Sequence, residues 1–503
     1  MIKSLKNSIV QRLNSLLEQG QVAIQFWTLS AIILFSILLA IAMDDLKILA
    51  LPAIALFIFL LIHDLRLIFL LLWASIPIST EFQLPGGFGT DMPSEPLAIL
   101  LMGFGIIWFL KNIQTVKLTH LFHPITILLL LHFGWIIITS IESLNPFISI
   151  KYTLAKSWYL AAYFFLPIAF INSEKVLRKW FLFITIPLVF SIIWVMFRHS
   201  GQSFTFASIN SVLSPFYRNH VSYACTIAIF LPFIWYQFVT SKKRAGKLKW
   251  IGILGFLLLA TYLSYTRAAY LCVPLMIVYF FVVRLKLTKW LITAGIVAAL
   301  AFIGFMANQN KYLEYAPNYD KTIAHYDFDN LISATYKMED ISTMERFYRW
   351  IAGGYMLRKK PVTGFGPGNF YNFYHNYADR NFITYVSDNP EKSGTHNYYL
   401  MVAVEQGLPG ILIFFLLICT MLIKGETLYH RSSIRKEKYF IMTCLLSLIS
   451  ILFILLLNDM IETDKVGAIF FFIAAMLVSI ELKWIRFQPE DLDKRILSDS
   501  SDN

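Results

Sequence analysis

Long apolar runs, separated by short polar segments, recur along most of the chain. Most of them approach the roughly 20 residues that an α-helix needs to cross the hydrocarbon core of a bilayer. The two runs at 48–63 and 67–80 are short for a full crossing, and a tilted or re-entrant pair would also account for them. Together the runs predict about fourteen helices, at residues 26–43, 48–63, 67–80, 95–110, 124–141, 156–172, 180–197, 219–239, 250–265, 268–283, 290–306, 398–423, 439–457 and 466–482.

The composition agrees with a membrane location. The chain of 503 residues is 57% hydrophobic and only 15% charged, with a mean hydropathy of +0.62. A soluble chain usually carries about 25% charged residues, so this one has too little polar surface for a soluble fold. The basic start is followed by a full-length span without a small-residue cleavage site, which is not the pattern of a cleaved signal. The chain is therefore predicted to be an all-α, polytopic integral membrane protein with twelve to fourteen transmembrane helices.

The distribution of charge predicts the orientation. Of the 43 lysines and arginines, 26 lie in segments on one side of the predicted bundle, and that side includes both termini. The loop 307–397 lies on the other side and is neutral, with ten basic and ten acidic residues. The positive-inside rule then puts both termini in the cytoplasm and the loop outside. Since topology explains the net charge of +12, no nucleic-acid partner is expected.

The long outer loop divides the chain. Long loops inside a compact protein are usually functional, so we expect the chemistry there. Apolar residues at spacings of three and four predict an amphipathic helix within the loop, around 341–355. The predicted regions are an N-terminal transmembrane region of about eleven helices (1–306), the large outer loop (307–397), the C-terminal transmembrane helices (398–483) and a cytoplasmic tail (484–503).

Two features of the loop suggest chemistry. Arg346 and Arg349 are three residues apart and project from one side of the predicted helix. His396 stands where the span 398–423 begins, and the positive end of a helix disfavours a charged imidazole. A neutral histidine can accept a proton at neutral pH, although an interfacial histidine without a chemical role would occupy the same position.

A glycine-rich stretch, Gly364-Phe-Gly-Pro-Gly368, lies between these features. Alternating glycines with a proline cannot form a regular helix and allow a tight turn with close backbone approach. The spacing is not that of a dinucleotide-binding fingerprint. A structural turn and a ligand contact both fit the pattern.

Two further arginines stand at the outer edge of the membrane. Arg267 lies between two spans with almost no loop, and Arg218 comes just before the span 219–239, followed by His220. Charge at membrane depth is costly and indicates function by default, while snorkelling to lipid headgroups is the alternative. Guanidinium groups match phosphate oxygens, so the arginines suggest a phosphorylated ligand. Neither carboxylates nor the four cysteines have metal-ligand spacing, so no metal or cofactor is expected.

Several of these motifs together resemble those of a known family. The resemblance covers roughly residues 210–425. The segments 343–346, 364–370, 396–397 and 405–410 resemble the signature region of the O-antigen ligase and polymerase superfamily. The segment Tyr265-Thr-Arg-Ala-Ala-Tyr-Leu271 is similar to the short arginine-bearing helix junction of that family. The usual ligases have twelve spans, so the N-terminal third departs from their pattern.

The resemblance implies a function. Such enzymes take a glycan from undecaprenyl diphosphate at the periplasmic face of the bacterial inner membrane, and the ligases transfer it to lipid A–core. These ligases are metal-independent, inverting glycosyltransferases that use no cofactor. Besides the glycan donor and the acceptor, the resemblance implies membrane lipids as partners. A polysaccharide polymerase or a protein O-oligosaccharyltransferase would use the same chemistry, and a lipid-linked-glycan transporter is the non-enzyme alternative. The implied catalytic residues are His396 and Arg267, and the implied diphosphate- or substrate-binding residues are Arg218, His220, Arg346 and Arg349.

Overall fold

The computed structural model describes residues 65–84, 88–111, 118–309, 341–379 and 394–483, with single positions beside these ranges. It divides into two compact units, residues 1–70 and 71–503. All the predicted site residues belong to the second unit. The predicted spans 26–43 and 48–63 lie outside the described residues, apart from three single positions.

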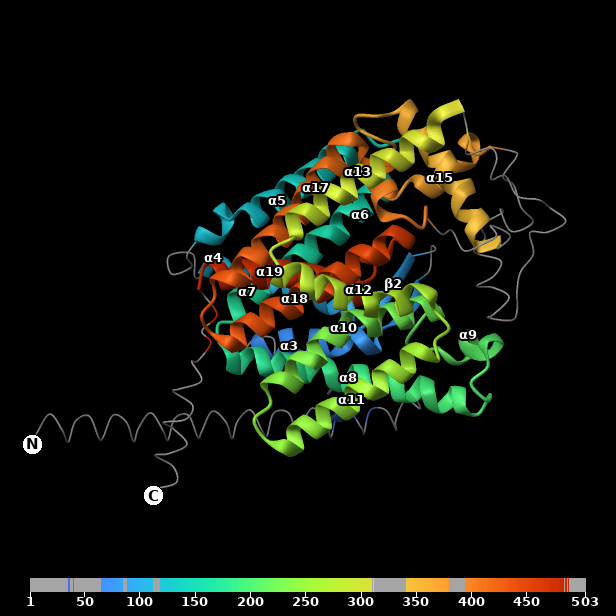
Figure 1. The fold of residues 1–503 in the computed structure, drawn as a ribbon. Helices are drawn as coiled ribbons and strands as arrows, with labels where there is room; N and C mark the ends of the chain where they lie inside the picture. The colour runs from blue at the N-terminus through green and yellow to red at the C-terminus, as the bar shows by residue number, and fades with distance from the viewer. Residues whose placement is uncertain are drawn as a thin grey trace, which may run out of the picture. The chain divides into compact units, whose positions relative to one another are not determined.

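The described part of the chain is almost entirely helical (Figure 1). Nine of the described helices are long and apolar enough to cross a membrane, namely α4 (Ser94–Lys111), α5 (Pro124–Ile141), α8 (Glu174–Ser200), α10 (His220–Thr240), α11 (Arg244–Tyr262), α12 (Arg267–Arg284), α13 (Thr288–Ala307), α17 (Tyr398–Arg431) and α18 (Arg435–Leu457). The chain is therefore a helical, multi-pass membrane protein. The number of fourteen spans and the division at residues 306, 397 and 483 stay predictions.

Burial separates the inner helices from the outer ones. Helices α10 and α18 are mostly buried and pack against each other, and α19 (Asp464–Glu481) is buried along nearly its whole length. In contrast, α13 exposes its apolar side chains all round, as a helix that faces lipid does. Aromatic rings fill the space between elements in the core, where Trp180 stacks on Phe472 at 3.9 Å between ring centroids.

Helix α19 is tied to its neighbours at both ends. At its first residue, the Asp464 carboxylate accepts a hydrogen bond from the Ser79 hydroxyl at 2.9 Å. At its last residue, the Glu481 carboxylate pairs with Lys424 at 2.8 Å and with the His123 imidazole at 2.7 Å. Charges at the ends of a buried helix are costly without partners, and here each carboxylate has them.

The predicted span 67–80 is wrong at its C-terminal end. Helix α3 (Leu65–Ser75) stops early and is followed by a short 3-10 turn, Ile76–Ile78, which includes Pro77. The chain then forms an antiparallel hairpin of β1 (Thr80–Leu84) and β2 (Phe88–Met92). Proline removes a backbone donor and ends the helix. The all-α prediction therefore missed one small sheet.

The predicted span 156–172 begins ten residues too late. The helical segment starts with α6 (Pro146–Tyr159), passes through a π-helical turn at Leu160–Phe165, and ends in α7 (Leu166–Phe170). Polar residues on α6 point into the protein, where Tyr152 and Lys156 both bind the Glu462 carboxylate at 2.8 Å. A search for apolar runs does not register such a polar but buried face.

The remaining described elements surround one end of the bundle. They are α9 (Ile209–Val212), α15 (Ile341–Lys359) and α16 (Phe370–Phe373). Helix α15 matches the amphipathic helix that the sequence predicts in the outer loop, and it packs against α17. This end of the bundle, where α17 and α19 begin and α18 ends, is called the site end below.

The predicted orientation can be tested by thiol labelling. In a variant without the four native cysteines, Ala207→Cys is exposed at the site end and Ser433→Cys is exposed between α17 and α18 at the opposite end. We expect an impermeant maleimide to label position 207 in cells with a permeabilised outer membrane, and position 433 only after lysis. Labelling with the reverse pattern would overturn the predicted orientation.

Candidate active site

The glycine-rich segment after α15 is held against a break in helix α17. Gly407 has φ 72° and ψ −177°, which interrupts the helix. At this break the Leu408 N–H donates to the Pro361 carbonyl at 2.8 Å. A Cβ atom at Gly407 would lie 1.9 Å from the carbonyl oxygen of Val362, so only glycine fits.

Two further backbone hydrogen bonds join the glycine-rich segment to α17. The Phe365 N–H donates to the Val404 carbonyl at 3.0 Å, and the Gly366 N–H donates to the Glu405 carbonyl at 2.9 Å. Gly364 has φ +66°, and a Cβ atom there would lie 2.5 Å from the backbone of Glu405. The two motifs, about forty residues apart in the chain, are therefore two halves of one packed structure.

The side chain of Glu405 completes the structure. Its buried carboxylate accepts the N–H groups of Gly368 and Phe370 at 2.8 and 2.9 Å. On the other side, the Asn369 amide donates to the hydroxyls of Ser143 and Ser149, both at 2.9 Å. Of the two interpretations of the glycines, these contacts favour the structural turn.

The loop that carries His396 is held by α15. The Arg349 guanidinium donates to the Gly394 carbonyl at 3.2 Å, and the Trp350 indole donates to the Thr395 carbonyl at 3.0 Å. Asn397 caps α17 by accepting the Leu400 N–H at 3.1 Å. His396 itself has a left-handed backbone, with φ 53°. Such strain in a residue other than glycine persists where the surroundings hold it, and it is common at functional sites.

His396 is neutral at physiological pH. The pKa of its imidazole is lowered to about 3, first by burial and then by the positive charges of Arg346 and Arg349, against a hydrogen bond with the Asn458 side chain. Its Nδ1 atom is buried and has no hydrogen-bond partner among the described residues. The sequence predicted the neutral state from the helix N-terminus, but burial and the two arginines are the causes that act here.

Arg346 and Arg349 differ in how far they are exposed and in what they contact. Arg349 is 5% exposed and also pairs with the buried Glu345 at 3.6 Å. It supports the His396 loop, whereas Arg346 is partly exposed on the same side of α15. A diphosphate contact stays a prediction for both, and Arg346 is the more accessible of the two.

Arg267, His220 and Arg218 form a second group at the site end. Helices α10 and α12 begin side by side, where the Thr266 hydroxyl donates to the His220 carbonyl at 3.2 Å. The Arg267 guanidinium acts electrostatically on the His220 imidazole, and Arg218 lies just before the Asn219 cap of α10. Two adjacent helix N-termini with two arginines favour an anionic ligand.

A strained residue also precedes Arg267. Tyr265, in the short junction between α11 and α12, has φ 53°, and its hydroxyl donates to the Phe204 carbonyl at 2.6 Å. The short junction agrees with the sequence, which places almost no loop between these two helices. His396 thus has a left-handed backbone itself, and Arg267 lies two residues after such a residue, Tyr265.

The turn between α18 and α19 lies beside the His396 loop. Asp459 contacts Gly394 so closely that a Cβ atom there would lie 2.0 Å from its carboxylate. The pKa of Asp459 is raised to about 6, first by burial and also by the Glu462 carboxylate, while Arg349 opposes the shift. Sequence reasoning missed Asn458 and Asp459, because they lie about sixty residues from His396 and belong to no motif.

The described residues contain no group of three histidines, cysteines or carboxylates that could hold a metal ion. Arginines and helix N-termini are positive groups that the described residues offer to an anionic ligand. The expected absence of a metal ion remains a prediction.

Comparison with known proteins finds one family model that matches part of the chain. Residues 252–415 match the family model described as O-antigen ligase. The matched range includes Arg267, Arg346, Arg349 and His396, while Arg218 and His220 lie ahead of it. The search of curated proteins found no match.

Proposed function

Because residues 252–415 match the family model described as O-antigen ligase, we propose that the chain transfers a glycan from undecaprenyl diphosphate to an acceptor hydroxyl, that of lipid A–core. The reaction takes place at the outer face of the bacterial inner membrane, with both chain termini in the cytoplasm. The observation that carries the proposal is His396 in its strained loop, with an Nδ1 atom that has no partner among the described residues and with Arg346 and Arg349 close enough to act on its imidazole.

His396 acts as general base in this proposal. Its unprotonated nitrogen takes the proton of the acceptor hydroxyl while the oxygen attacks the anomeric carbon. The anomeric C–O bond breaks, and its electron pair stays on the diphosphate, which leaves from the opposite face so that the configuration inverts. A positioned general base typically accelerates proton transfer by about 10²–10⁴-fold.

The arginines bind the leaving group. Arg267 and Arg218, at the N-termini of α12 and α10, contact the diphosphate, and Arg346 approaches it from α15. Negative charge grows on the bridging oxygen as the bond breaks, so preorganised cations stabilise the transition state more than the ground state. His220 borders this site and positions the donor rather than reacting.

A deletion strain of the source bacterium tests the acceptor. If the chain is a ligase, lipopolysaccharide from the deletion strain carries no O-antigen, and polymer accumulates on undecaprenyl diphosphate. Complementation restores ligation. Lipopolysaccharide with a single repeat unit would instead identify a polymerase. Unaltered lipopolysaccharide together with loss of glycan from a secreted protein would identify a protein O-oligosaccharyltransferase.

A further inference from the structure

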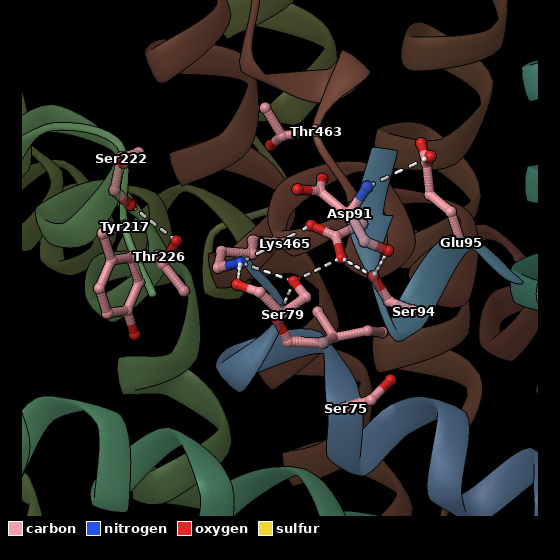
Figure 2. A network of polar contacts seen from close by, with 12 residues as sticks. Ser75, Ser79, Asp91, Ser94, Glu95, Tyr217, Ser222, Thr226, Thr463 and Lys465 are labelled. Atoms are coloured by element: carbon pink, nitrogen blue, oxygen red, sulfur yellow. Dashed lines mark hydrogen bonds and ion pairs between the residues drawn. The ribbon is translucent and has the colours of Figure 1, made fainter. Parts of the chain in front are cut away.

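A polar cavity of about 450 Å³ lies beside the two site groups. This volume is within the 300–1,000 Å³ of typical small-molecule sites. Five segments bound it, namely the β1–β2 hairpin, the start of α4, the residues ahead of α10, the start of α10 itself, and the turn between α18 and α19. Its polar lining includes Arg218, Lys465 and five carboxylates, those of Glu81, Asp91, Glu95, Glu462 and Asp464. Figure 2 shows Asp91, Glu95 and Lys465 from this lining.

Three of the five carboxylates in the lining are used by the fold. Glu95 accepts the Thr90 hydroxyl at 2.7 Å, Glu462 binds Tyr152 and Lys156, and Asp464 binds Ser79. The Lys465 ammonium is also used, since it donates to the Ser79 carbonyl and hydroxyl at 3.0 and 2.8 Å. These groups form the frame of the cavity.

The other two carboxylates, of Glu81 and Asp91, are available. They stand directly opposite each other in the hairpin register, and both line the cavity. Neither side chain has a hydrogen-bond or ion-pair partner among the residues that the structure describes. Like charges directly opposite in a sheet are destabilising, so the fold carries this pair at a cost to stability.

The surroundings of Asp91 disfavour its charged form. Burial raises the pKa of its carboxyl to about 7, and the Asp464, Glu95 and Glu81 carboxylates raise it as well, against the charge of Lys465. The hairpin therefore places two carboxylates along one side of the cavity, where they disfavour an anionic sugar, while Arg218 lines the cavity as a positive group. A ligand that donates hydrogen bonds relieves the repulsion.

We propose that this cavity is the subsite for a non-anionic sugar residue of the transferred glycan, with Glu81 and Asp91 accepting hydrogen bonds from its hydroxyl or ammonium groups. The inference rests on the proposed function, and it adds the class of sugar that the enzyme accepts. Arg218 lines the same cavity, so the sugar next to the diphosphate is the one that fits. The turn that carries Glu462 also carries Asp459, which contacts the His396 loop.

The test compares two synthetic donors that differ in one group. They are undecaprenyl diphosphate–glucose and undecaprenyl diphosphate–glucuronic acid, with bare undecaprenyl diphosphate as the third probe. We expect purified wild-type protein in detergent to bind the glucose donor about tenfold more tightly than the glucuronic acid donor, since one hydrogen bond to a charged group has an effect of this size.

The double variant Glu81→Gln with Asp91→Asn should bring this ratio close to one while bare undecaprenyl diphosphate binds as before. Its melting temperature should equal or exceed that of the wild type, because the like-charge pair is gone. The matched control is Glu142→Gln, an exposed carboxylate outside the cavity, which should keep the wild-type ratio.

The outcomes separate the two proposals. If bare undecaprenyl diphosphate does not bind the wild type, the proposed function fails and the inference fails with it. If the bare lipid binds but the wild type does not discriminate between the sugars, or the double variant keeps the ratio, the donor subsite is refuted while the function stands. If the double variant instead raises only the acceptor KM, the cavity holds a sugar of the acceptor.

Discussion

Replacing His396 by alanine should reduce glycan transfer by about 10²–10⁴-fold while leaving the affinity for undecaprenyl-diphosphate-linked glycan close to that of the wild type. The change removes the proton acceptor, whereas the arginines at α10 and α12 remain. Glutamine at this position should also fail, because an amide cannot take the proton. The loop itself should stay in place, since Arg349 and Trp350 bind the backbone of residues 394 and 395.

Arg267 provides the contrasting variant. Arg267→Ala should weaken both donor binding and turnover, because a guanidinium on the diphosphate acts in the ground state and more strongly in the transition state. Arg267→Lys should restore little, since an ammonium keeps the charge but loses the planar fork.

The measurements are the transfer rate and the donor Kd of each purified, folded variant. Near-normal transfer by His396→Ala would show that the histidine is only structural. Loss of donor binding in that variant would show that His396 contacts the diphosphate instead.

Gly407→Ala should destabilise the protein severely. With positive φ and extended ψ, a residue other than glycine costs about 1–3 kcal/mol, and the added Cβ would also lie 1.9 Å from the Val362 carbonyl oxygen. The break in α17 and the segment after α15 would have to separate, which breaks the backbone hydrogen bond from Leu408 to Pro361. We expect a large fall in melting temperature in detergent and poor yield of folded protein.

Gly354→Ala is the matched control. Gly354 lies in α15, and no atom lies within 4 Å of a Cβ placed there. Alanine is favoured over glycine inside a helix by up to about 1 kcal/mol, so this variant should be as stable as the wild type or slightly more stable. Equal stability of the two alanine variants would contradict the packed arrangement of the two motifs.

Spans with clear apolar runs could be predicted closely from the sequence. The range 124–141 is the same in the prediction and the structure, because a proline at 124 and the polar residues after 141 bound the run. Segments whose polar residues are buried by tertiary contacts could not be predicted in this way. The start of α6 is one example, since Tyr152 and Lys156 are buried against Glu462.

The candidate site could also be predicted only in part from the sequence. The position of His396 at the start of α17 predicts a neutral imidazole. Burial, the main cause of its lowered pKa, appears only in the fold. The cavity could not be predicted, because Asp91 and Asp464 come from opposite ends of the chain. Nothing in the spacing of the glycines shows that Gly364 lies against Glu405, so their structural role also needed the fold.

The double attachment of α19 has a mechanical consequence. Alternating access requires one half of a protein to rock against the other about a central site. Such rocking would have to break the contact of Asp464 with Ser79 at one end of this helix, or those of Glu481 with Lys424 and His123 at the other. On the proposed function, a core tied in this way suits substrates that meet at the site end only. The lipid-linked donor would then reach the site end through a separate transport step across the bilayer.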